Sequence, residues 1–465
     1  MSRRAVVIGA GLGGLLAAAA LSRAVDEVTV LDRDALPEGP EHRRGVPQGR
    51  HAHLLMAGGL TAIESLLPEA DVRKRLLAAG AHEVSLSSGV LSLTAEGWLH
   101  RWRRPGPHLL TCSRALLEWA VRDLVTTHTK TVIRQGTVTG LLGSADRVRG
   151  VRLDDATDLP ADLVVDASGR GSRALTWLDA LGIPPVTTRT VDSGLVNATR
   201  VYRVPRGAER FPLTVVHANP HLSRPGRSGM VLPIEGDRWM VSLAGTRGAE
   251  PPSDPAAFLQ YTLDLPDPIV GRLISGAEPL TDVHVSHSTS NVRRYFEKAP
   301  RWPEGLVVLG DAVATFNPAY GQGMSVAALG ARVLADEVRH SAADAPGLAR
   351  RVQRGVARSV ETAWSSAVSQ DVLYPDVRGG SPRPTDRLVT AYSRRLMRAA
   401  AGSYKAASVL WDVTSMRGGP TRALHPDALL ATLTGPLVRP ATEAPLTPDE
   451  RRVLALLDRT GAVAG

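Results

Sequence analysis

The chain has 465 residues, 43% of them hydrophobic, which is enough for two joined hydrophobic cores. Its net charge of +9 comes mostly from scattered arginines without a nucleic-acid motif, so no nucleic-acid partner is expected. The single cysteine, Cys112, excludes an internal disulfide and is expected to be a buried apolar side chain. No apolar run reaches the roughly 18 residues of a membrane span, and no signal region precedes the first predicted strand, so we expect a cytoplasmic protein.

Residues 1–35 predict a βαβ unit in which a strand, a glycine-rich turn and an alanine-rich helix lead to a second strand ending at Asp32. The turn contains Gly9, Gly11, Gly13 and Gly14. In the Gly-x-Gly-x-x-Gly pattern the first glycine makes a tight turn, the second lets the backbone approach a pyrophosphate, and the third lets helix and strand pack closely. An acid at position 32 binds an adenosine ribose and repels a 2′-phosphate, which favours FAD or NAD over NADP.

The segments that follow complete a predicted first unit. They are a loop at 36–53, helices at about 53–66 and 69–79, strands near 83–103, a helix capped by Ser113, a β-excursion at 130–153 and a parallel strand at 162–167. Residues 100–104, His-Arg-Trp-Arg-Arg, are interpreted as a strand with a solvated basic face. A further possibility is that Trp98 and Trp102 face a substrate cleft.

Pro184 and Pro185 mark the passage to a second unit whose short runs favour an antiparallel sheet, suited to the floor of a substrate pocket. Those runs are 194–203, 229–233, 238–244 and 282–290. His284 and His287 would point to opposite faces of a strand, so no metal site is expected. The chain returns to the first unit near residue 303. Helices dominate from residue 322, and the loop at 374–387 is expected to be flexible.

The predicted domains are a discontinuous α/β unit at 1–183 and 298–370, a β-sheet unit at 184–297 and a helical C-terminal region at 371–465. Residues 306–326, LVVLGDAVATFNPAYGQGMSV, indicate which dinucleotide binds. This segment resembles the second flavin-binding motif of the class A flavoprotein monooxygenases. The resemblance implies that Asp311 bonds a ribityl hydroxyl and that the following helix start directs N–H groups at the N1–C2=O edge of the flavin. The matching residues are Gly310, Asp311, Pro318, Gly321, Gly323 and Met324.

Two further features indicate a subfamily: the run HRRGVPQGRHAHLL at 42–55 and the Ser113-Arg114 pair. From the N-terminus to about residue 370 the chain is similar to the flavin epoxidases of polyether antibiotic biosynthesis in actinomycetes. The similarity implies a Rossmann-like FAD-binding domain, non-covalent FAD and O2 as the oxygen source. The predicted cofactor contacts also include Arg33, Arg44 and Arg114.

Residues 161–175 match a family segment that ends in an Asp-Gly pair associated with both FAD and NAD(P)H. This chain has Ser168-Gly169 there, and its nearest acid, Asp166, lies two residues early and is expected to end a strand. NAD(P)H is therefore expected to supply electrons either directly, through transient binding, or through a separate flavin reductase.

The resemblance implies a monooxygenase that acts through a C4a-hydroperoxyflavin. Its predicted reaction is the epoxidation of alkenes in a large apolar intermediate of polyketide antibiotic biosynthesis. Epoxidation needs no side-chain base, so no catalytic residue is assigned, and Arg50, His51 and His53 are candidates by family analogy. Alternatives are aromatic hydroxylation, Baeyer–Villiger insertion, FAD-dependent cyclisation or a non-catalytic flavin-binding protein. Halogenation is not favoured, because the Trp-x-Trp-x-Ile-Pro segment of flavin halogenases and its accompanying lysine are absent.

Overall fold

A parallel five-stranded sheet carries the N-terminal βαβ unit in the computed structural model, which describes residues 2–287, 289–382 and 384–461. In spatial order its strands are β19 (Leu306–Val308), β11 (Leu163–Asp166), β1 (Arg4–Ile8), β2 (Glu27–Asp32) and β7 (Thr131–Gln135). The central strands are apolar along their length because both faces of the sheet are covered. The predicted β-excursion at 130–153 is wrong at its start, since β7 belongs to this parallel sheet.

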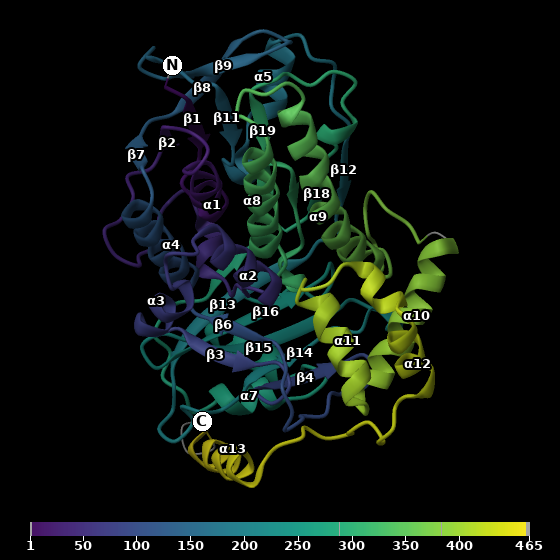
Figure 1. Ribbon diagram of the computed structural model, residues 1–465. Coiled ribbons are helices and arrows are strands. Elements are labelled where there is room, and N and C mark those ends of the chain that lie inside the picture. The colour runs from purple at the N-terminus through teal and green to yellow at the C-terminus, as the bar shows by residue number, and fades with distance from the viewer. Residues whose placement is uncertain (1, 288, 383, 462–465) are drawn as a thin grey trace.

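Helices pack around this sheet, and α1 and α8 lie side by side next to it (Figure 1). The helices of this unit are α1 (Leu12–Leu21), α2 (Ala57–Leu66), α3 (Val72–Ala78), α4 (Arg114–His128), α5 (Ala174–Ala180), α8 (Gly323–His340) and α9 (Leu348–Asp371). Ser113 caps α4 as predicted, because its Oγ accepts a hydrogen bond from the N–H of Leu116. A three-stranded sheet of β8 (Val138–Gly143), β9 (Val148–Leu153) and β10 (Asp158–Pro160) packs beside β11.

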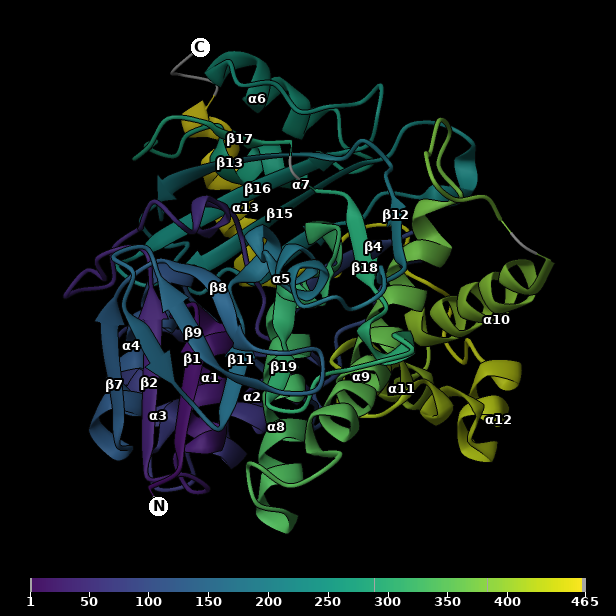
Figure 2. The same ribbon diagram turned by 90° about the horizontal axis from the view of Figure 1, so that it is seen from above.

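A seven-stranded sheet lies beside the parallel sheet (Figure 2). Its order is β17 (His284–Ser286), β13 (Val196–Arg203), β16 (Arg238–Gly245), β15 (Arg227–Ile234), β14 (Leu213–Val216), β4 (Val90–Thr94) and β5 (Gly97–Trp98). The expected antiparallel pairing holds except between β14 and β4, which are parallel. Strands β4 and β5 come from within the first predicted unit, so the chain crosses between the two sheets before residue 183 as well as after it.

The two faces of the seven-stranded sheet have different neighbours, as alternation along β16 shows. Trp239, Val241 and Leu243 pack in a core with α6 (Pro255–Leu263), α7 (Ile269–Ile274) and α13 (Pro448–Gly461). Met240 points the other way and packs in a cluster that includes Leu54 of the first unit. A smaller three-stranded sheet consists of β12 (Thr188–Val191), β18 (Asn291–Arg294) and β20 (Ala314–Thr315).

The C-terminal region is helical, as predicted. Helices α10 (Pro384–Ala401), α11 (Tyr404–Thr414) and α12 (Pro426–Thr434) share a core of their own, and α13 lies apart from them beside α7 (Figure 1). The expected loop at 374–387 ends earlier, because α10 begins at Pro384. Within this loop, the backbone of Arg378 forms an isolated antiparallel bridge with that of Asp192, which follows β12. Among the described residues, no helix is long and apolar enough to cross a membrane.

The expected strand at 100–104 is not formed. The neighbouring strands are β3 (His82–Ser85), β4, β5 and β6 (His108–Thr111). Part of the segment between β5 and β6 contacts the C-terminal region. Arg101 pairs with Glu450 at 2.6 Å, and the rings of Trp102 and Tyr404 are 6.0 Å apart. Trp98 is 1% exposed in the core below the seven-stranded sheet. The expected strand is therefore wrong, whereas Arg103 and Arg104 are exposed as the solvated basic segment predicts. Trp98 lies in a core and Trp102 packs against Tyr404, so neither ring is free to face a cleft.

Candidate functional site

The turn between β1 and α1 can be built only with glycine at two positions. Gly9 has φ +97°, and a Cβ there would lie 2.7 Å from the carbonyl oxygen of Ala167. A Cβ on Gly14 would lie 1.8 Å from the carbonyl oxygen of Gly9. Gly11 precedes α1 without a capping side chain, which leaves the helix N-terminus accessible to an anionic group. Gly13 is different, since a Cβ there would make only a 3.7 Å contact with Ala327.

Asp32 ends β2 beside this helix start, and protein donors already bond its carboxylate. The carboxylate accepts the N–H of Ala10 at 2.7 Å, the N–H of Asp34 at 3.0 Å and Nη1 of Arg43 at 3.0 Å. Arg43 also bonds Glu118, with 2.8 Å between Nε and Oε1. Its Nη2 lies 3.6 Å from the position of a Cβ on Gly11, so a cationic side chain is placed at the start of α1.

The three arginines predicted to contact the cofactor differ in their exposure and in their acidic partners. Arg33 and Arg44 are exposed, and the closest acid to Arg33 is Asp34, at 4.0 Å. Arg114 pairs with Glu118 at 3.1 Å, within the same acidic cluster as Arg43. Sequence reasoning selected Arg44 and missed Arg43, because two adjacent arginines in a loop carry no signal for which one turns inward.

The second predicted motif brings Asp311 to the start of α8. Gly310 and Gly321 have φ of +61° and +62°, which allow the two tight turns of this segment. A Cβ on Gly323 would lie 3.8 Å from Oδ1 of Asp311. Burial raises the pKa of Asp311, while the charges of Arg114, Arg170 and Arg294 act to lower it.

Two acceptors in this segment have no donor among the described residues. Within the described part of the chain, no side chain or backbone group donates a hydrogen bond to the Asp311 carboxylate. Oε1 of Gln322, the residue before α8, is buried and also lacks a partner there. FAD carries hydroxyl and N–H donors, so this pair of acceptors fits the predicted cofactor. Pro318 and Met324 lie on either side, and Met324 is buried.

The loop before α2 is attached to the seven-stranded sheet by His51. Its Nδ1 lies 2.9 Å from Oγ1 of Thr199 on β13, which in turn lies 2.7 Å from Oγ of Ser242 on β16. Nδ1 of His53 lies 2.8 Å from the carbonyl oxygen of His51. Burial lowers the pKa of His51 to about 4 and that of His53 to about 3. Both rings are therefore neutral near pH 7 and serve to hold the loop rather than to supply a proton.

Other titratable candidates have structural partners. Arg50 is exposed and lies 3.5 Å from the ring nitrogens of His284. Asp166 ends β11 as predicted, and its carboxylate accepts hydrogen bonds from the hydroxyls of Ser168 and Ser172, each at 2.5 Å. Cys112 is buried, as predicted, and burial raises the pKa of its thiol to about 12. No group of three potential metal ligands is assembled within the described ranges.

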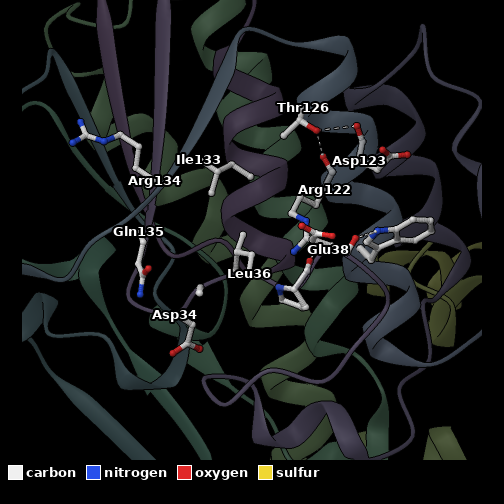
Figure 3. Close-up of a pocket in the computed structure, with 12 residues that line it drawn as sticks. Asp34, Leu36, Glu38, Arg122, Asp123, Thr126, Ile133, Arg134 and Gln135 are labelled. Atoms are coloured by element: carbon white, nitrogen blue, oxygen red, sulfur yellow. Dashed lines mark hydrogen bonds between the residues drawn. The ribbon is translucent and has the colours of Figure 1, made fainter.

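A groove of about 440 Å³ opens at the carboxyl ends of β2 and β7, where Asp34, Leu36, Arg122 and Ile133 surround it (Figure 3). Nε1 of Trp119 donates to the carbonyl oxygen of Glu38 at its rim. A second hollow shares Pro37, Trp119 and Arg122 with this groove and reaches Arg43 and Arg114. Ligands of open α/β sheets bind at the carboxyl ends of the strands, so these hollows adjoin the expected nucleotide end of the site.

Comparison with known proteins supports the same reading. Residues 3–342 match a family model described as an FAD binding domain. Protein Rv3254 of Mycobacterium tuberculosis (strain ATCC 25618 / H37Rv) is 34% identical over 390 residues, which cover 80% of this chain and 80% of that protein.

Two solved structures share the fold. The flavin-dependent brominase Bmp2 has a TM-score of 0.62 and 16% identity, covering 92% of this chain and 98% of its own. PqsL from Pseudomonas aeruginosa, described as a probable FAD-dependent monooxygenase, has a TM-score of 0.59 and 16% identity, covering 80% and 97%. At this level of identity the likeness concerns the fold.

Proposed function

The chain belongs to the FAD-binding-domain family. We propose that it is an FAD-dependent monooxygenase that epoxidises an alkene of a large apolar intermediate in secondary metabolism. The observation that carries the proposal is the Asp311 carboxylate, which lies at the start of α8 without a donor from the described residues. A carboxylate placed in this way can accept a hydrogen bond from a ligand hydroxyl.

Each part of the site has a role in holding FAD. The start of α1 and the Arg43 guanidinium neutralise the pyrophosphate, and Asp32 accepts from the adenosine ribose. Asp311 accepts from the ribityl chain, and the N-terminus of α8 stabilises negative charge on the flavin ring. When bound and reduced, FAD would supply the electrons that activate O2, one atom of which goes to the substrate and the other to water.

The proposed reaction needs no side-chain base, and the ionisable groups near the site are consistent with this. His51 bonds Thr199, His53 bonds a backbone carbonyl, and Asp166 accepts from two serines. Transfer of an electrophilic oxygen to an isolated alkene requires placement and exclusion of water, whereas hydroxylation of a phenol benefits from a base. This favours epoxidation over the aromatic hydroxylase alternative.

An apolar substrate suits the sheet face directed at the first unit. Met240 of β16 and Leu54 of the loop before α2 belong to one apolar cluster on this face. The His51, Thr199 and Ser242 chain lies on the same face and joins the loop to the sheet. We place the substrate alongside this face. Bromination does not follow from the shared fold with Bmp2, because the tryptophan motif expected of halogenases is absent from the sequence.

Electrons come from NAD(P)H, bound transiently or through a separate flavin reductase. The turn at Gly169–Gly171 offers no ribose carboxylate of its own, since Asp166 is buried and bonded to Ser168 and Ser172. Calorimetry with NADPH should give no tight stoichiometric binding. A tight one-to-one complex would contradict this part of the proposal.

Incubation with ¹⁸O2 and a reductant, with candidate polyenes and aromatics as substrates, tests the reaction. We expect mass spectrometry to find one ¹⁸O atom per turnover in an epoxide, and none with an Asp311→Ala protein that has lost FAD. Oxygenation of aromatics alone would support the hydroxylase alternative. A wild-type protein that binds FAD and is reduced, yet incorporates no ¹⁸O into any substrate, would contradict oxygen insertion.

A further inference from the structure

A buried carboxylate outside the predicted motifs lies behind the segment that leads into α8. Asp371 ends α9 and is 1% exposed. Its carboxylate accepts hydrogen bonds from Oη of Tyr320 at 2.6 Å, from Nδ2 of Asn291 at 2.6 Å and from Nδ2 of Asn317 at 3.1 Å. Ser193 Oγ approaches it at 3.5 Å. One acid thus accepts from four donors, which come from three segments that are distant in sequence.

Two of these donors belong to the short turn immediately before α8. Asn317 and Tyr320 flank the turn at Pro318–Tyr320, and Gly321 follows in a left-handed conformation. The backbone N–H of Asn317 also donates to Oδ1 of Asn291 at 2.8 Å, and its own Oδ1 accepts from the N–H of Ala319 at 2.9 Å. The position of the turn is therefore fixed from behind by Asp371 and Asn291.

Only an acceptor with several lone pairs can satisfy this set of donors. An ionised carboxylate has that capacity, whereas an amide in its place would point an NH2 group at the NH2 of Asn291 or Asn317. Burial raises the pKa of Tyr320 well above its ordinary value, and the neighbouring Asp371 adds to this, so the phenol remains a donor. Burial also raises the pKa of Asp371, and the hydrogen bonds from Tyr320, Asn317 and Asn291 oppose that rise.

We propose that Asp371 is a positioning residue for the flavin: by holding Asn317 and Tyr320 it orients the N-terminus of α8, and thereby sets FAD affinity and the flavin reduction potential. The inference rests on the proposed function for the statement that α8 faces the flavin. The N–H groups at a helix start stabilise an anionic reduced flavin best when they are correctly aimed. A turn released from Asp371 would aim them less well.

Three variants and one control test the proposal. Asp371→Asn replaces one acceptor oxygen by an NH2 donor, and Tyr320→Phe removes one donor. The double variant Asn317→Asp/Asp371→Asn exchanges the positions of the acid and the amide. Glu361→Gln is the matched control, because Glu361 also joins α9 to β18, through Arg293, without touching the turn. For each protein we would measure the Kd for FAD, the midpoint potential, the visible spectrum and the melting temperature of the apoprotein.

We expect Asp371→Asn to weaken FAD binding about tenfold, since it leaves buried donors without an acceptor, and to make the midpoint potential more negative. Tyr320→Phe should give a smaller change in the same direction, and it decides the matter if Asp371→Asn does not fold. The double variant should recover part of the loss, and Glu361→Gln should keep wild-type flavin properties.

A lower apoprotein melting temperature with wild-type Kd, potential and spectrum in Asp371→Asn and Tyr320→Phe would overturn the inference, because Asp371 would then be only structural. These readouts do not depend on turnover. A wild-type enzyme that binds FAD but does not oxygenate therefore contradicts the proposed function alone, whereas unchanged flavin properties in the variants of an oxygenating enzyme contradict this inference alone.

Discussion

The two carboxylates predicted to bind FAD differ in what surrounds them. Asp32, at the nucleotide end, is bonded by Ala10, Asp34 and Arg43, so it is part of the folded βαβ unit. Asp311, at the flavin end, is partly exposed and meets no donor from the described residues. The difference shows that two residues with the same predicted ligand role can differ in their importance for folding. Asp32 stabilises the folded chain through its own hydrogen bonds, whereas the Asp311 carboxylate is available to bind a ligand.

The largest effect is expected at Gly14, where the fold at the nucleotide end of the site leaves no room for a side chain. Gly14→Ala should cost about 3 kcal/mol or more and abolish FAD binding, because its Cβ would lie 1.8 Å from a backbone oxygen. Gly13→Ala on the same helix should be neutral or stabilising by up to about 1 kcal/mol, because it removes a helical glycine and makes only a 3.7 Å contact. Urea unfolding of both variants checks this, and equal losses would show that crowding at Gly14 is not the cause.

Asp32→Ala should lower both the stability of the apoprotein and FAD affinity. It leaves the N–H of Ala10 and the buried guanidinium of Arg43 without their acceptor, at a cost of about 3 kcal/mol in the free energy of unfolding. Unfolding measured without FAD isolates this effect from ligand binding. An apoprotein as stable as wild type would mean that Arg43 and Asp32 do not depend on each other.

Asp311→Ala should lower FAD affinity without lowering the stability of the apoprotein. FAD binding should weaken by about 1.5–3 kcal/mol through loss of a charged hydrogen-bond partner. The apoprotein should stay about as stable as wild type, because the partly exposed carboxylate accepts no hydrogen bond from a described residue. Fluorescence titration with FAD, together with melting of the apoprotein, measures both. Loss of apoprotein stability as large as in Asp32→Ala would break the comparison.

The smallest effect is expected at the loop that joins the two units. His51→Ala removes the bond to Thr199, about 1 kcal/mol, and should reduce product formed per NAD(P)H consumed without abolishing it. A variant with full flavin and no product would instead make a side-chain acid or base essential.

Stability should also depend on pH through this residue. Because the pKa of His51 falls from 6.5 to about 4 on folding, unfolded chains take up the proton first as the pH drops. The stability it contributes is complete above pH 6.5 and is lost between there and pH 4. Unfolding curves at pH 7 and 4.5 should differ less for His51→Ala than for wild type, and an equal difference would show that another group is responsible.

Local patterns in the sequence were sufficient for the strand, turn and helix units that carry glycines. Gly9, Gly14 and Asp32 lie within one continuous segment, and the start of α8 follows Gly321 as predicted. These features could be predicted because the spacing of the glycines and the acid is local, although Gly9 also leaves room for the carbonyl oxygen of the distant Ala167.

Features that depend on distant partners were not predictable. Arg43 pairs with Asp32 and Glu118, whereas the adjacent Arg44 does not, and nothing in the local sequence distinguishes them. Residues 100–104 contact Glu450 and Tyr404 of the C-terminal region and do not form the expected strand. The hydrogen bonds to Asp371 were not predicted for the same reason, since its donors come from positions 193, 291, 317 and 320. Such clusters have no local spacing that a single sequence could reveal.

Release of the bound flavin from the purified protein tests the central claim most directly. After acid precipitation, chromatography of the supernatant should show FAD in about a one-to-one ratio to the polypeptide, with no flavin left on the pellet. Release of FMN alone, flavin retained on the polypeptide, or a wild-type protein that takes up no FAD on titration would contradict the assignment of the Gly9, Asp32 and Asp311 site.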